Sequence, residues 1–225
     1  MSYSQRVQPI VGTVPRALGR RSFMFALGGA AVLLAQPAVA GSEDLLKELA
    51  KARSTLKTLT ASFEQTRVIG LLAEPVKSKG ELVLVRPEQL RWELFAPDDI
   101  VYWVNKSGVS YRAGKSGKPA SVPRKGGFTA VLDDLMTFLG GDVAALSSRY
   151  DLSASSHSDG SISLVALPKA DDLKKHLKRI AMRSNAEKWG ISSVEIEDAT
   201  GDLSTISFGA NEKDKKIDPA RMKPS

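Results

Sequence analysis

The sequence predicts a mainly β protein with a few helices, built on an antiparallel sheet. From Thr60 onward, short β-rich segments follow one another, separated by Gly, Pro, Asn and Asp. Most of the connections are too short for the crossover helix that a parallel sheet requires. Two amphipathic segments, one before the series and one within it, predict helices. The fold class is therefore an antiparallel sheet, sandwich or barrel with helices available to cover one side.

The first predicted element is a helix over residues 42–59. Ser42 can cap its amino end, and Glu43 and Asp44 lie where the helix dipole favours negative charge. Its apolar residues have the spacing of a single helical stripe, at Leu45, Leu49, Ala52, Leu56 and Leu59. One face of this helix is thus expected to pack against the sheet.

Ten strands are predicted after this helix. Five precede the second helix, at residues 61–69, 80–86, 89–95, 100–105 and 109–113. Five follow it, at residues 150–154, 161–166, 177–183, 191–198 and 203–208. The sequence shows no internal repeat and no domain linker, so one curved sheet is expected.

The second predicted helix spans residues 128–139 and ends at Gly140-Gly141. Its apolar positions are Phe128, Val131, Leu132, Leu135, Met136 and Leu139. Together the two helices could cover the concave side of the sheet. Residues 114–127, "GKSGKPASVPRKGG", are basic and rich in Gly and Pro, which favours a mobile solvated loop. The alternative is a docking surface for an anionic membrane or an acidic partner.

Residues 1–40 have the features of a secretory signal peptide. They contain four arginines and no acidic residue, then an apolar run over residues 22–35 and the triplet Ala38-Val39-Ala40. The apolar run is shorter than the roughly 20 residues of a membrane-spanning helix, which disfavours an uncleaved anchor. Arg20-Arg21 also resembles a twin-arginine export signal, although an ordinary basic region fits equally well. Either route predicts a periplasmic location, with the mature chain beginning at Gly41.

The remaining 185 residues are enough for about one domain, expected over residues 41–225. They keep 28 basic and 25 acidic residues, a net charge of +3, so much of the basic balance belongs to the leader. This balance does not support a nucleic-acid partner. The chain has no cysteine, which excludes thiol catalysis, thiolate metal sites and a lipidated N-terminal cysteine.

The sequence gives no catalytic or metal-binding motif. His157 lies in the polar, turn-like stretch "SSHSDG" and His176 among lysines, and neither belongs to a recognisable catalytic arrangement of carboxylate and serine. Two acidic pairs are interpreted as helix surface (residues 133–134) and helix start (residues 171–172), because adjacent helical residues do not face each other. No metal, no cofactor and no enzymatic activity are therefore expected.

Residues 80–95 carry the candidate binding face. Strand alternation places Leu82, Leu84 and Arg86 on one face of a strand, and Leu90, Trp92 and Leu94 on one face of the next. An apolar sheet face beneath movable helices could hold lipid tails. An ordinary packed core would give the same pattern, so both interpretations remain open at this point.

Five features occur in a particular order along the predicted domain. A helix precedes "ASFEQT" (61–66) and "GELVLVRPEQLRWELFAPD" (80–98), and a second helix ends in "FLGGD" (138–142) before "VEIEDATGDLSTISFGANEKDKKID" (194–218). This order resembles the LolA-like family of periplasmic outer-membrane lipoprotein carriers. The resemblance implies an unclosed antiparallel β-barrel, or half-barrel, with a helical lid over a hydrophobic cavity.

The resemblance also implies a function and its partners. It implies a monomeric carrier of acylated lipoproteins, from an inner-membrane ABC transporter to an outer-membrane acceptor. Arg86 matches the family arginine that holds the lid through hydrogen bonds, although a strand-end arginine reaching solvent is the alternative. Trp92 matches the family tryptophan, and Leu90 stands where familiar members have an aromatic residue. The implied lipid-binding and lid residues are Leu82, Leu84, Arg86, Leu90, Trp92 and Leu94.

Two departures from the family pattern concern partner and cargo recognition. The segment after Trp103 is basic and divergent, and the chain ends at "ARMKPS" where many members continue. A carrier of a glycolipid or another envelope lipid is therefore the alternative function. A regulator that senses lipids or mislocalised lipoproteins on the same fold is a further one.

Overall fold

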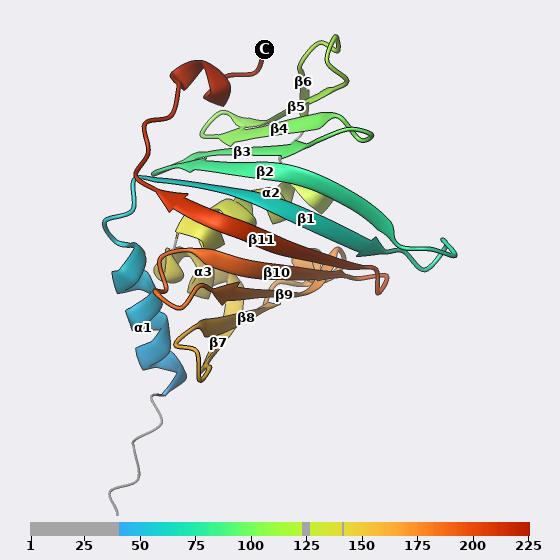
Figure 1. The fold of residues 1–225 in the computed structure, drawn as a ribbon. Coiled ribbons are helices and arrows are strands. Elements are labelled where there is room, and N and C mark those ends of the chain that lie inside the picture. Colours follow the sequence, from blue (N-terminus) through green and yellow to red (C-terminus); the bar gives the residue numbers. More distant parts are fainter. Residues whose placement is uncertain (1–40, 123–126, 141) are drawn as a thin grey trace, which may run out of the picture. The chain divides into compact units, whose positions relative to one another are not determined.

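Eleven antiparallel strands form one sheet in the computed structural model, in the order β6-β5-β4-β3-β2-β1-β11-β10-β9-β8-β7 (Figure 1). The strands are β1 (Thr58–Val68), β2 (Val76–Val85), β3 (Gln89–Leu94), β4 (Ile100–Asn105), β5 (Gly108–Ala113), β6 (Ala120–Val122), β7 (Tyr150–Ser156), β8 (Ile162–Pro168), β9 (Leu177–Ser184), β10 (Ile191–Asp198) and β11 (Leu203–Lys213). The edge strands β6 and β7 belong to the two ends of this order, so the sheet is unclosed. The predicted mainly β half-barrel is confirmed.

The structure describes residues 41–122, 127–140 and 142–225, and the side chains from residue 134 onward in the second long helix. The predicted signal peptide, residues 1–40, lies outside the described residues. So do residues 123–126 of the basic segment. Part of that segment was wrongly predicted as loop, because β6 pairs with β5 through Tyr111 and Ala120 and extends the sheet by one strand.

The helices are α1 (Ser42–Arg53), α2 (Gly127–Gly140), α3 (Val143–Arg149), α4 (Asp171–Lys174) and the 3₁₀ turn η1 (Pro219–Met222). Figure 1 shows α2 and α3 on one face of the sheet, where α2 contacts β2 and β4 while α3 contacts β7. Helix α1 packs against β7, β8 and α3. In the described part of the chain, no helix has the length and apolarity needed to cross a membrane.

Helix α1 ends six residues earlier than predicted. Leu56 and Leu59 are buried, as the stripe required, but Leu59 belongs to β1. Threonines at positions 58 and 60 favour the extended backbone, where branched side chains fit the pleated surface. The earlier end of the helix makes Arg53 the last residue of α1.

Helix α3 was not predicted. Asp142 caps it by accepting a hydrogen bond from the Ala145 backbone N–H at 3.0 Å. The cap immediately follows the glycine pair that was interpreted as the end of the helical region. A new helix therefore starts directly after that stop signal.

The apolar core lies between the sheet and the helices. Leu82 and Leu84 of β2, Leu90 and Trp92 of β3, and Phe138 of α2 belong to one buried cluster. Gly80 lets this cluster close, because a Cβ at this position would lie 2.4 Å from the Phe63 ring and 2.0 Å from the Glu93 carbonyl oxygen. The Phe63 ring therefore packs directly on the backbone of β2.

The opposite face of the sheet carries a second, smaller buried patch. Val83, Val101 and Trp103 alternate with the core residues and are at most 3% exposed. The segment after β11 covers them: η1 contacts β3, Met222 is buried, and the Trp103 indole N–H donates to the Arg221 carbonyl oxygen at 3.0 Å. The C-terminal residues thus pack on the sheet face away from the main core.

Candidate binding cavity

The main core does not fill all the space beneath the sheet. A cavity of about 450 Å³ remains next to α2 and the β10–β11 turn, which is within the usual range for small-molecule sites. Its apolar lining comes from β1, β3, β4, β10, β11, α2 and the start of β9. These residues include Val68, Ile69, Trp92, Leu94, Ile100, Leu135, Leu177, Ile196, Leu203 and Ile206.

Three aromatic rings stand beside this lining. Phe63 stacks on Trp92 with ring centroids 4.1 Å apart, and Phe208 meets Trp92 edge-on at 6.2 Å. Both stacked and edge-to-face pairs are favourable arrangements of aromatic rings, and in the edge-to-face pair the positive edge of one ring meets the negative face of the other. The cluster fixes the Trp92 ring, so one wall of the cavity is rigid.

Polar side chains gather at the cavity mouth. They include Gln65, Arg67, Asp98, Tyr102, Lys175, His176, Asp198 and Asp202. The carboxylates already have partners: Asp98 accepts from the Ser78 hydroxyl, Asp202 from the Gly70 N–H at 2.9 Å, and Asp198 from Thr200 and the Asp202 N–H. Hydrogen bonds from Thr200 and neighbouring backbone groups lower the pKa of Asp198 despite the opposing effect of burial. These three carboxylates therefore mainly stabilise the turns around the mouth of the cavity.

Leu135 of helix α2 lines one side of the cavity. The C-terminal end of α2 is hydrogen-bonded to Arg53. The guanidinium of Arg53 donates to the Phe138 carbonyl oxygen at 2.9 Å. It also donates to the carbonyl oxygens of Gly190 at 2.8 Å and Lys188 at 3.2 Å. Free carbonyl groups at a helix end need such donors. One side chain thus joins the end of α1, the end of α2 and the β9–β10 turn.

Arg53 is a buried cation. It is 1% exposed, and burial, with a smaller effect from the nearby positive charge of Arg86, lowers its pKa to about 10. The group still carries its proton at neutral pH. Its charge is stabilised by carbonyl dipoles, which explains why three of them converge on one guanidinium.

A second anchor of α2 is Asp134, which is 2% exposed. Its carboxylate accepts from the Arg149 guanidinium at 2.5 Å and from the Tyr150 hydroxyl. Burial and this hydrogen bond strongly raise the pKa of Tyr150, so the phenol stays protonated. The interpretation of Asp134 as helix surface was wrong, because the apolar pattern could not show that α3 and β7 supply partners. Asp171 and Asp172 do start a helix, α4, as predicted.

The predicted site residues separate into three groups in the structure. Trp92 and Leu94 line the cavity. Leu82, Leu84 and Leu90 lie in the packed core and have no exposed surface. Arg86 lies beside the C-terminal end of α2, and its Nη1 donates to the Arg53 carbonyl oxygen at 2.6 Å. Contact of these five apolar residues with a ligand, and a lid role for Arg86, stay predictions.

Arg53 was missed at the sequence level, although the sequence carries one signal for it. It follows Leu45 and Leu49 at intervals of four residues, so it lies on the buried stripe of α1. A charged residue in that register must find polar partners inside the protein. The sequence does not say which carbonyl groups these are.

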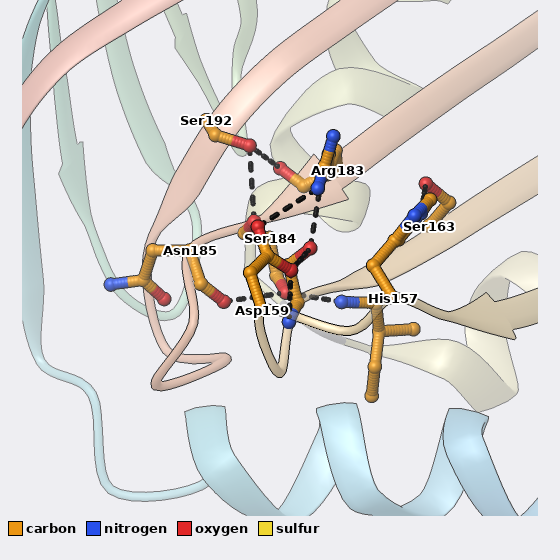
Figure 2. Close-up of polar contacts among 9 residues, drawn as sticks. His157, Asp159, Ser163, Arg183, Ser184, Asn185 and Ser192 are labelled. Carbon is orange, nitrogen blue, oxygen red and sulfur yellow. Dashed lines mark hydrogen bonds and ion pairs between the residues drawn. The ribbon is translucent and has the colours of Figure 1, made fainter.

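A further polar cluster lies at the β7–β8 turn (Figure 2). His157 Nε2 is 2.7 Å from Ser163 Oγ, a contact that the sequence did not predict. The nearby Asp159 does not complete a triad with it. One carboxylate oxygen accepts from Ser161 and the other from Arg183 at 2.8 Å, as Figure 2 shows for Arg183. Hydrogen bonds from Ser161, helped by Arg183, lower the pKa of Asp159 to about 2.

Geometry therefore favours a structural role for this cluster. An acid that orients a catalytic histidine must accept its ring N–H. Here one oxygen of Asp159 accepts from Ser161 in the turn, and the other accepts from Arg183 of the neighbouring strand β9. The cluster fixes the hairpin ends, and the Ser184 and Asn185 positions in Figure 2 extend the same network toward β10.

Comparison with known proteins gives one family. Residues 54–225 match the model of the family described as outer membrane lipoprotein carrier protein LolA. No curated protein matches the sequence.

Solved structures with a similar chain path were also found. A LolA superfamily protein from Nitrosomonas europaea has 10% identity and a TM-score of 0.44, with 82% of this chain and 98% of that chain covered. An outer membrane lipoprotein-sorting protein domain from Vibrio parahaemolyticus has 10% identity and a TM-score of 0.47, with 81% and 95% covered. The MucA/MucB complex of Pseudomonas aeruginosa has 13% identity and a TM-score of 0.45, with 82% and 61% covered.

Proposed function

Because the chain belongs to the LolA family over residues 54–225, we propose that it is a periplasmic carrier of acylated lipoproteins. In this proposal the acyl chains enter the cavity beneath the sheet. An inner-membrane ABC transporter loads the carrier, and an outer-membrane acceptor receives the cargo. The observation that carries the proposal is the partly empty apolar cavity of about 450 Å³ beside the anchored helix α2.

The physical chemistry of the cavity suits acyl chains. Burying each methylene contributes about 0.8 kcal/mol, so one long chain contributes on the order of 10 kcal/mol before opposing terms. A cavity of fixed shape would bind such a chain too tightly for delivery. Displacing α2 from its anchors at Arg53 and Asp134 opposes binding, and α2 returns to them on release. The anchors thereby limit the affinity.

Direct handover follows from the same energetics. An acyl chain that passed through water would lose the whole burial free energy at once. The acceptor must therefore offer another apolar cavity while the first one empties. The proposed mechanism is binding and exchange, without a chemical step.

The first test is native mass spectrometry of the mature protein purified from its own periplasm, with identification of bound molecules. Ile196→Trp fills the cavity from β10, and Leu167→Trp, on an exposed position of β8, is the matched control. We expect bound triacylated lipoprotein in the wild type and the control. Occupancy of Ile196→Trp should fall by about tenfold or more, since a loss of about 1.4 kcal/mol already gives that factor.

Other outcomes would favour the alternatives. A bound glycolipid or phospholipid would indicate a carrier of another envelope lipid. Co-purification with a membrane-anchored regulator would indicate a sensor. A protein that is empty and also fails to bind acylated peptides in vitro would contradict the proposed binding function.

A further inference from the structure

One residue of the cavity lining has a buried polar atom without a hydrogen-bond partner. In the described part of the chain, four side-chain polar atoms are buried without a hydrogen bond, on Arg67, Glu88, Arg91 and Arg112. Arg91 is in ion pairs with Glu81 and Glu93, and Glu88 pairs with Lys106. Of the four residues, only Arg67 lines the main cavity.

Arg67 stands between the apolar interior and the mouth of the cavity. It ends the inward-facing row of β1 that starts with Phe63 in the core and continues through Gln65. Tyr102 lies near it: burial raises the pKa of Tyr102, and the positive charge of Arg67 acts against that effect. The guanidinium is therefore inside the site and close to its polar rim.

The acids of the rim do not satisfy this donor. Asp98, Asp198 and Asp202 accept hydrogen bonds from Ser78, Thr200 and Gly70, respectively, as part of the surrounding turns. The buried Nε of Arg67 has no such bond. A buried N–H without an acceptor is unfavourable, and most such groups in native proteins are satisfied. A ligand oxygen at this point would remove the penalty.

We infer that Arg67 binds the oxygen at the carbonyl end of an acyl chain whose methyl end lies among Trp92, Leu94 and Leu135. This inference rests on the proposed function and adds the orientation of the ligand to it. The guanidinium offers several N–H donors in a fixed plane, which suits a carboxylate or an ester oxygen. The chain therefore enters with its methyl end first, and its head group stays at the rim beside Lys175 and His176.

The experiment compares three ligands that share chain length and differ at one end: lauric acid, methyl laurate and dodecane. Each displaces Nile red from the wild type, from Arg67→Gln and from the control Arg183→Gln. Arg183 is also a partly exposed strand arginine, and its partners are Asp159 and Ser161 at the β7–β8 turn. We expect Arg67→Gln to bind the oxygen-containing ligands about tenfold more weakly, as for one lost hydrogen bond to a charged group. Dodecane should bind both proteins equally.

The outcomes separate the two sources of the oxygen. A loss for both laurate and its methyl ester supports recognition of an acyl ester, and a loss for laurate alone supports recognition of a free carboxylate. If Arg67→Gln fails to fold, Arg67→Lys gives the same comparison, with carbon NMR of carboxyl-labelled laurate reporting the changed surroundings of the head.

Equal affinity of wild type and variant for all three ligands, with an unchanged carboxyl resonance, would overturn the inference while leaving the carrier proposal intact. If none of the ligands displaces Nile red from the wild type, the proposed binding function itself fails.

Discussion

At the residue scale, the positions of three distant segments depend on Arg53. Its partners Phe138 and Gly190 are 85 and 137 residues away in sequence. A buried arginine held by neutral acceptors is unfavourable unless all of them are in place. The guanidinium therefore favours the arrangement in which α1, α2 and the β9–β10 turn meet. Arg86 adds to this by donating to the Arg53 carbonyl group at the end of α1.

Arg53→Met should lower the free energy of unfolding by about 3 kcal/mol, because buried carbonyl groups lose their donor. Amide hydrogens in the C-terminal half of α2 should exchange faster with solvent. Chemical denaturation and hydrogen exchange measure the two effects, with Lys51→Met on the exposed face of α1 as the control. Unchanged exchange in α2 would contradict the anchoring role of Arg53.

Arg86→Leu tests the family-derived lid role separately. It removes one hydrogen bond at the edge of the core, so the protein should stay folded. If Arg86 helps to return the lid, cargo should be retained longer or transferred poorly to an acceptor. Binding and release equal to those of the wild type would leave Arg86 with a purely local role.

At the element scale, α2 combines buried apolar side chains, among them Leu135, Phe138 and Leu139, with polar attachments to neighbouring elements. Asp134 and the Phe138 carbonyl group lie one helical turn apart and bind different neighbours. Such a helix can be displaced as a unit when a ligand supplies apolar contacts in return. In the proposed function, bound acyl chains replace apolar contacts of α2, and the polar attachments favour its return.

Tyr150→Phe removes one donor to the buried Asp134 carboxylate. We expect the free energy of unfolding to fall by about 2 kcal/mol, since a hydrogen bond to a charged group is lost. Urea denaturation measures this, with Tyr111→Phe at a 36% exposed position as the control. Equal losses in the two variants would show that Asp134 is satisfied without the phenol.

At the scale of the whole molecule, the sheet buries apolar side chains on both faces. Helices cover one face and the C-terminal residues cover part of the other. Arg221 also pairs with Glu81, and Arg112 donates to the Ser225 carbonyl oxygen at 2.9 Å. The cavity and the C-terminal cover are thus on opposite faces and should respond to mutation independently.

Removal of residues 217–225 tests this independence. Exposure of Val83, Val101 and Trp103 together with loss of the Met222 contacts should lower the free energy of unfolding by about 3 kcal/mol. Nile red affinity of the cavity should stay unchanged in the folded fraction. Denaturation and dye titration measure the two quantities, and a truncated protein with full stability would contradict the covering role.

The sequence by itself determined the class of this fold and most of its elements. Alternation along β2 and β3 places Leu82, Leu84, Leu90 and Trp92 on the buried face, and the stripe of α1 identifies Leu45 and Leu49. These signals are local, because strand and helix periodicity act over a few residues. Trp92 and Leu94, two of the predicted binding residues, line the cavity, and their contact with a ligand stays a prediction.

Only the tertiary structure decided how polar residues are used. Arg53 and Asp134 have partners on other elements, and β6 is a strand because β5 provides an edge for it. The pairing of His157 with Ser163 likewise depends on the register of β7 and β8. The periodicity of a sequence predicts which side chains point into the interior, but not which atoms they contact there. A buried charge is stabilised only by particular distant atoms, and these come together when the sheet and its helices are assembled.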